Sequence, residues 1–81
     1  MIKVINYLTE INVSCLFQKV KTERTPNGDI YSFNVYTLSN GYEIKQNDRH
    51  YILLKKGRRQ IACFYEEDFV EQIKLFFEGK K

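Results

Sequence analysis

The chain has 81 residues, 43% of them apolar, and a formal net charge of +3. This length makes one small domain, residues 1–81, whose stability depends on a well-filled core. The two cysteines are far apart and form no Cys-x-x-Cys pair, which excludes a disulfide framework, and no apolar run approaches the ~18 residues of a membrane span.

The start of the sequence lacks a basic stretch followed by an apolar segment and a cleavage site, so we expect a cytoplasmic protein. Residues with codons rich in A and T, such as Lys, Asn, Ile, Phe and Tyr, are frequent. This usage is typical of a low-GC bacterium or of its bacteriophages and plasmids.

The first segment, residues 2 to 11, places Ile2, Ile5, Leu8 and Ile11 at three-residue spacing, with Val4 beside Leu8. This spacing predicts a narrow apolar stripe on a short helix. Poor helix formers fill most of the remaining positions, so a strand is the alternative.

Residues 16 to 25 and 30 to 38 alternate between apolar and polar side chains and predict two strands. Asn27-Gly28 lies between them, and Asn40-Gly41 follows the second strand. Asn-Gly is the strongest short hairpin signal, because a two-residue type I′ turn needs positive φ at both positions. Two such loops would place Val20 opposite Val35, and Thr37 opposite Ile44.

Asn47-Asp48 and then Gly57-Arg58, or residues 56 to 59, predict two more hairpins, with Ile44 opposite Tyr51. This register assigns one face of the sheet to Leu16, Val20, Tyr31, Phe33, Val35, Tyr42, Ile44, Tyr51, Leu53, Ala62 and Phe64. It assigns an opposite apolar area to His50, Ile52, Leu54, Ile61, Cys63 and Tyr65. The rest of that opposite face is predicted to be wet and carries Lys19, Lys21, Asn34, Tyr36, Glu43 and Lys45.

The C-terminal helix is the clearest element. Three acids, residues 66 to 68, begin it, Lys74 and Lys80 lie toward its end, and Gly79 is a candidate left-handed cap. Its apolar stripe, of which Phe69, Ile73 and Phe76 are expected in the core, consists of Phe69, Val70, Ile73, Phe76 and Phe77.

These elements predict an α+β fold: a five-stranded antiparallel meander sheet with the C-terminal helix packed on one face and a short N-terminal helix as a further element. Ile52, Leu54, Ile61 and Cys63 would form an exposed apolar patch unless something covers them. We therefore expect either residues 2 to 11 or another chain on that second face.

The basic side chains gather in residues 45 to 59, where Asp48 is the single acid. A basic hairpin beside exposed tyrosines suits an acidic protein surface or a phosphate backbone. The alternative is that these charges only keep turns and edge strands soluble. The candidate partner-binding residues are Lys45, Arg49, Lys55, Lys56, Arg58, Arg59 and Tyr36.

No catalytic, metal or cofactor motif accompanies these features. His50 with Cys15 or Cys63 is a weak candidate for a nucleophile and base, because both cysteines occupy apolar-alternating positions, where a thiol behaves as a small hydrophobe. One histidine and two distant cysteines do not form a zinc shell. The acids from Glu66 to Glu71 are interpreted as helix-dipole partners and solvated side chains.

We therefore expect a non-enzymatic protein-binding module without a cofactor. Small size and AT-rich coding suggest a bacterial or phage accessory protein that inhibits a larger host machine, such as a defence nuclease targeted by anti-CRISPR or antirestriction proteins. The main alternative is a nucleic-acid-binding module that stacks bases on Tyr36 or another exposed tyrosine. It would bind phosphates with the basic residues Lys45, Lys55, Lys56, Arg58 and Arg59. A second alternative is a homodimer through the apolar patch around Ile52 and Ile61.

Overall fold

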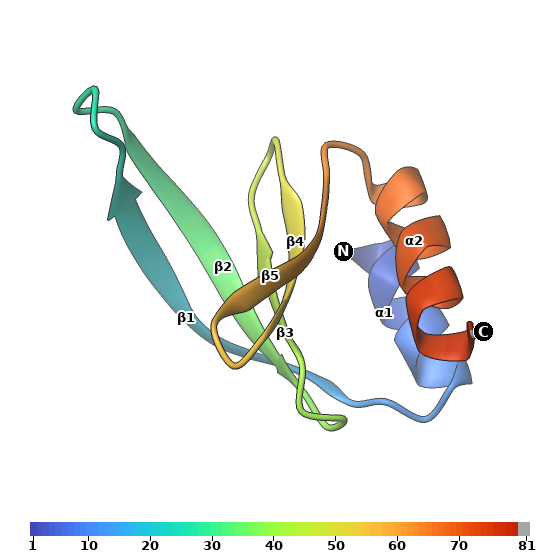
Figure 1. Ribbon diagram of the computed structural model, residues 1–81. Coiled ribbons are helices and arrows are strands. Elements are labelled where there is room, and N and C mark those ends of the chain that lie inside the picture. The colour runs from blue at the N-terminus through green and yellow to red at the C-terminus, as the bar shows by residue number, and fades with distance from the viewer. Residues whose placement is uncertain (80–81) are drawn as a thin grey trace.

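The computed structural model describes residues 1–79 (Figure 1). The elements in chain order are α1 (Ile2–Glu10), β1 (Cys15–Arg24), β2 (Ile30–Leu38), β3 (Glu43–Gln46), β4 (Tyr51–Lys55), β5 (Arg58–Cys63) and α2 (Glu66–Glu78). The strands form one antiparallel sheet in the order β1-β2-β3-β4-β5. The predicted α+β fold, with its five-stranded meander and packed C-terminal helix, is confirmed. No helix within residues 1–79 is long and apolar enough to cross a membrane.

Both helices pack on the same side of the sheet (Figure 1), whereas residues 2 to 11 were expected on the opposite side. The segment is helical, but Val4, Tyr7 and Leu8 are its buried residues, and Ile2 is exposed. The predicted stripe fails because each three-residue step turns a helix by about 300°, so four such positions drift across half of its circumference. The i, i+3, i+4 set stays on one side.

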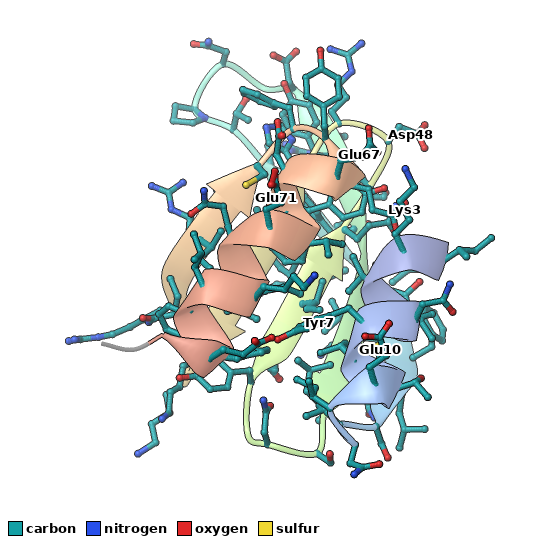
Figure 2. All side chains as sticks on the ribbon, turned by 90° about the vertical axis from the view of Figure 1, so that its right-hand side faces the viewer. Lys3, Tyr7, Glu10, Asp48, Glu67 and Glu71 are labelled. Carbon is teal, nitrogen blue, oxygen red and sulfur yellow. The ribbon has the colours of Figure 1, made fainter. Side chains whose placement is uncertain are left out.

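Hydrogen bonds also join the two helices across almost the whole sequence. The backbone N–H of Val4 donates to the Glu66 carboxylate at 3.1 Å, and the Met1 amino group lies 3.1 Å from the same carboxylate. At the other end, the Tyr7 hydroxyl donates to Glu78 at 2.6 Å (Figure 2). The two helices are thus joined near their starts, through Glu66, and near their ends, through Glu78.

Helix α2 begins with the three predicted acids and buries Phe69 and Ile73 completely. Phe76, which was expected in the core, is 42% exposed and contacts the ring of Tyr42, the residue just before β3. Phe77 packs against the core instead. Gly79 has a φ of −58°, so it is not the predicted left-handed cap. The expected role of Lys80 lies outside the described residues.

The two Asn-Gly sequences form three-residue loops, not the predicted two-residue loops. In Pro26-Asn27-Gly28, Thr25 donates its N–H to the Asp29 carbonyl at 2.8 Å, and Gly28 alone has positive φ, +90°. The loop Ser39-Asn40-Gly41 repeats this arrangement, with a φ of +93° at its glycine. A turn followed by a left-handed glycine is the usual geometry of a three-residue hairpin loop.

One additional loop residue shifts the partner strand by one position and therefore swaps its faces. Val20 lies opposite Asn34, not Val35. Phe33 and Ile44 lie on opposite faces of the sheet, although the sequence placed them on the same one. The predicted register is wrong at both of these hairpins.

The later hairpins also differ from the prediction. Their loops are Asp48-Arg49 and Lys56-Gly57, the second with positive φ at both residues, as a type I′ turn requires. Ile44 therefore lies opposite Leu53 and not Tyr51. Two-residue loops still join β3 to β4 and β4 to β5, so the strand order of the meander is as predicted.

Two glutamines interrupt the edge strands. Gln18 in β1 and Gln60 in β5 are extra residues at which the pairing with the neighbouring strand shifts by one position. Such bulges bend the strand and increase its twist. Both edges of this sheet are therefore locally irregular.

Cross-strand partners share a face, so the register defines two surfaces. The covered face packs on α1 and α2 and includes Cys15, Tyr36, Leu38, Ile44, Tyr51, Leu53, Ile61 and Cys63. The open face has no helix over it and includes Lys19, Lys21, Glu23, Tyr31, Phe33, Val35, Glu43, Lys45, Ile52, Leu54 and Arg59. The predicted second apolar patch is therefore divided, because Ile52 and Leu54 lie on one face, and Ile61 and Cys63 on the other.

Candidate functional site

The open face combines lysines with apolar side chains. One row crosses the sheet as Lys19, Val35, Lys45, Ile52 and Ala62, each opposite the next on the neighbouring strand. Cations thus alternate with apolar groups along the hydrogen-bonding direction. Val35 in this row is buried, whereas Lys19 and Ala62 are exposed, so the row offers a partner charge with only limited apolar contact.

A hollow of about 300 Å³ lies in this face. Lys19 and Lys21 of β1 border it on one side, and Leu54 and Gly57 border it on the other, with Val35 between them. Because β1 and the β4–β5 turn border the same hollow although β2 and β3 lie between them, the open face is concave. The strong twist of the bulged edge strands favours this curvature.

An ionic network lies within the hollow. Glu23 accepts a hydrogen bond from Lys45 at 2.5 Å and lies 3.7 Å from the Lys21 ammonium. The hydrogen bond from Lys45 is the main cause that holds the pKa of Glu23 below its usual value, although burial opposes it. Lys19 forms no ion pair within residues 1–79. The network therefore holds Lys21 and Lys45 against Glu23, whereas Lys19 can pair with an acidic group of a partner.

The apolar residues beneath this network are already buried. Phe33 and Val35 are each 7% exposed although no helix covers them. The Lys45 ammonium lies 4.8 Å from the centre of the Phe33 ring, so the lysine covers the aromatic face. Consequently, the hollow presents charged groups over a filled apolar base.

The predicted basic residues do not form one cluster. Lys55, Lys56, Arg58 and Arg59 gather at the exposed β4–β5 turn, whose Gly57 borders the hollow. Arg59 shares the open face with Leu54, whereas the Lys55 ammonium lies 5.0 Å from the centre of the Tyr42 ring on the helix side. Lys45 lies inside the hollow.

Arg49 is exposed in the β3–β4 turn, at the other end of β4. The five residues of β4 separate the two turns, a span of about 17 Å at 3.3–3.4 Å per residue. Arg49 instead borders a separate hollow with Tyr31 and Asp48. The basic segment of the sequence is therefore divided between two ends of the sheet.

Tyr36 is not on the wet face where the sequence placed it. It lies on the covered face, opposite Phe17 and Ile44, and its ring contacts Phe17 edge to face at 5.7 Å. Burial raises the pKa of its hydroxyl. Because β2 is shifted by one residue relative to the prediction, Tyr36 and Val35 have exchanged faces.

The side chains considered for nucleophilic chemistry are dispersed. Burial raises the pKa of Cys15, and burial together with Asp68 raises that of Cys63, which favours the less reactive thiol forms. The His50 ring contacts Phe64 at 5.2 Å, and its Nδ1 has no hydrogen-bond partner within residues 1–79. In the same part of the chain, no three His, Cys, Asp or Glu side chains are arranged to hold a metal ion.

Two of the acids at the start of α2 have structural partners. Burial by itself would raise the pKa of Glu66, but the hydrogen bond from Val4 and the nearby amino terminus outweigh this effect and lower it. Glu67 lies 3.2 Å from Lys3 of α1 (Figure 2). These two acids therefore connect the helices, in addition to interacting with the helix dipole.

Sequence reasoning recognised Lys19 and Lys21 as exposed but did not include them in the binding site. The signal that would have placed them was Pro26. In a two-residue Asn27-Gly28 loop, Pro26 would occupy a paired strand position without an N–H to donate, whereas the first position of a longer loop suits its fixed φ. That loop length places Lys19 opposite Val35.

Comparisons of the chain with models of protein families, with curated proteins and with solved structures find no match.

Proposed function

We propose that this chain is a non-enzymatic protein-binding module that presents its open face to an acidic surface of a larger protein. The observation that carries the proposal is the concave hollow bordered by Lys19, Lys21 and Lys45, with the basic β4–β5 turn at its rim. Three lysines and the nearby arginines outnumber the two acids of the hollow, Glu23 and Glu43. A positive concave surface attracts an acidic partner and accelerates its association.

A protein partner is favoured over a nucleic acid because no aromatic side chain borders the hollow within the described residues. Proteins that bind single strands use exposed rings on which bases stack. Here Phe33 is covered by Lys45, and Tyr36 lies on the other face of the sheet. Tyr31 is exposed on the open face, but it borders the separate hollow that contains Arg49. The narrower expectation, an inhibitor of a host defence nuclease, remains a prediction for which the partner must first be found.

The proposal is tested by capture from a bacterial lysate with three immobilised proteins and mass spectrometry of what each retains. The first is the native chain. The second is a turn variant in which serine replaces the four basic residues of the β4–β5 turn, Lys55, Lys56, Arg58 and Arg59. The third is a control variant in which serine replaces four exposed basic residues elsewhere, Lys3, Arg24, Arg49 and Lys74.

We expect both variants to remain folded, because exposed charges each contribute little to stability. The native chain and the control variant should retain the same acidic protein, and the turn variant should lose it. Binding of the purified partner should slow mainly in its association rate. Equal retention by all three proteins would refute the proposal.

A parallel titration with a labelled 20-nucleotide single strand tests the alternative. Nucleic-acid binding should weaken with salt with a log–log slope of about −0.7 per phosphate contacted. A steep slope that becomes shallower in the turn variant would identify a nucleic-acid-binding module instead.

A further inference from the structure

The second surface of interest lies at the opposite edge of the sheet from β1. Strand β5 is the last strand and pairs only with β4. A hollow of about 470 Å³ runs between β5 and α2, bordered by residues 60 to 63 of the strand and by Asp68, Glu71 and Gln72 of the helix. We call this hollow the β5–α2 groove.

The groove follows the backbone edge of β5. Side chains of consecutive strand residues point to opposite faces of a sheet. Four consecutive residues, 60 to 63, can border one hollow only if it lies along the edge, where the unpaired N–H and C=O groups are. Such an edge is a template for an added strand, and Ile61, Ala62 and Cys63, which follow the bulge at Gln60, include no charge or proline to block it.

The helical wall of the groove is acidic. Asp68, Glu71 and Gln72 are spaced i, i+3 and i+4, so they lie on one side of α2. Neither carboxylate forms an ion pair within residues 1–79. Glu67, by contrast, forms an ion pair with Lys3 of α1. Figure 2 labels all three of Lys3, Glu67 and Glu71.

We propose that the β5–α2 groove binds a short extended segment of a partner protein as a sixth strand, with Lys or Arg at alternate positions facing Asp68 and Glu71. Main-chain hydrogen bonds to β5 supply affinity, and the acidic wall supplies specificity, as in other complexes formed by strand addition. Alternate residues of a strand are about 6.6 Å apart. This spacing is close to the distance of about 5–6 Å between the Cβ atoms of helix residues three apart, such as Asp68 and Glu71.

One feature distinguishes β5 from the other edge strand. Both strands carry a bulge flanked by basic residues, Lys19 and Lys21 in β1, and Arg58 and Arg59 in β5, and such features disfavour pairing near the bulge. Beyond its bulge, however, β5 lies beside a groove that is walled by the acidic side of α2. It also lies apart from the open-face hollow, so this inference does not depend on the proposed function.

Fluorescence anisotropy tests the proposal with a labelled peptide of sequence TKVKVK, blocked at both ends. We expect saturable one-to-one binding to the folded chain. The paired substitutions Asp68→Asn and Glu71→Gln should weaken it about tenfold, because two charge-assisted contacts are lost. A control with equal charge change outside the groove, Glu10→Gln with Asp48→Asn, should change it less than about twofold.

Backbone N-methylation of the peptide tests strand addition directly. In an extended peptide, successive N–H groups point to opposite edges. One isomer carries N-methyl groups on the odd residues and lacks the N–H groups of one edge, and the second carries them on the even residues and lacks those of the opposite edge. Only one of the two isomers should lose binding, because an added strand uses one edge. In the unmethylated complex, backbone amides within residues 60 to 63 should exchange more slowly with solvent.

Three outcomes would overturn the proposal. The first is equal binding by the two methylated isomers, and the second is equal loss in the groove variant and its control, since each shows attraction by charge alone. The third is a native chain that is dimeric by size-exclusion chromatography and becomes monomeric in the groove variant. That result would assign the groove to a second copy of this chain.

Discussion

Replacement of Phe69 by alanine, compared with the same change at Phe76, tests how α2 packs. Phe69 is fully buried, and its ring centre lies 5.6 Å from that of Tyr51, so its truncation leaves a cavity under the helix. The cost should be about 3–5 kcal/mol. Phe76 is 42% exposed and contacts Tyr42 at 5.6 Å, so its truncation should cost only about 1–2 kcal/mol.

Urea unfolding monitored by circular dichroism at 10 °C measures both free energies. Each kcal/mol lowers the melting temperature of a domain this small by about 4–8 °C, so Phe76→Ala should melt about 5–15 °C below the native chain. If Phe69→Ala has no folded population, Phe69→Leu and Phe76→Leu provide the comparison, and the Phe69 change should again be costlier. Equal costs at the two positions would refute the docking of α2 described above.

Three further outcomes are expected. Tyr7→Phe removes the hydroxyl that donates to Glu78 and should lower the free energy of unfolding by about 1–2 kcal/mol, measured by the same urea titration; no change would contradict a structural role for that bond. The hydrogen bond from Lys45 lowers the pKa of Glu23 in the fold, so this pairing should stabilise the native state at every pH above the ordinary pKa of a glutamate. The contribution should disappear as the pH falls through the lowered pKa. Glu23→Gln should therefore flatten the acid limb of a melting-temperature profile, and an identical profile would exclude the linkage. Deletion of residues 1–11 removes three buried core side chains and should abolish the cooperative thermal transition, whereas a monodisperse truncation with a native spectrum would show that α1 is dispensable.

The element types could be predicted because each depends on local signals. The acids at the start of α2 and its apolar spacing predict a helix whatever the strands do. Short alternating segments between Asn-Gly sequences predict hairpins, and sequential hairpins produce a meander. All of this was confirmed, since none of it depends on which residue lies opposite which.

The register could not be obtained in the same way, because it depends on loop length to one residue. Asn27-Gly28 fits both a two-residue and a three-residue loop, and the two choices place opposite faces of β2 on the helices. Apolar alternation did not resolve this, because Phe33 and Val35 are buried on the open face by lysine side chains rather than by a helix. The location of Tyr36 was wrong for the same reason.

The candidate binding site depended on the register and was therefore only partly predictable. The basic β4–β5 turn was recognised from local charge, which needs no tertiary information. The hollow needed the curvature of the whole sheet, because Lys19 and Gly57 border it together only after the edge strands bend. The β5–α2 groove needed the position of α2 beside the last strand.

The contact between the helices has a consequence for the order in which the protein folds during synthesis. Strands β1 to β5 can pair as they leave the ribosome, because each neighbour in the sheet is also a neighbour in the chain. Helix α1 precedes the sheet in the chain, yet its Val4 amide bonds to Glu66 and its Tyr7 hydroxyl bonds to Glu78, both in α2. During synthesis α1 therefore waits with its apolar residues unprotected until α2 emerges, and ribosome-associated chaperones should bind it during that interval.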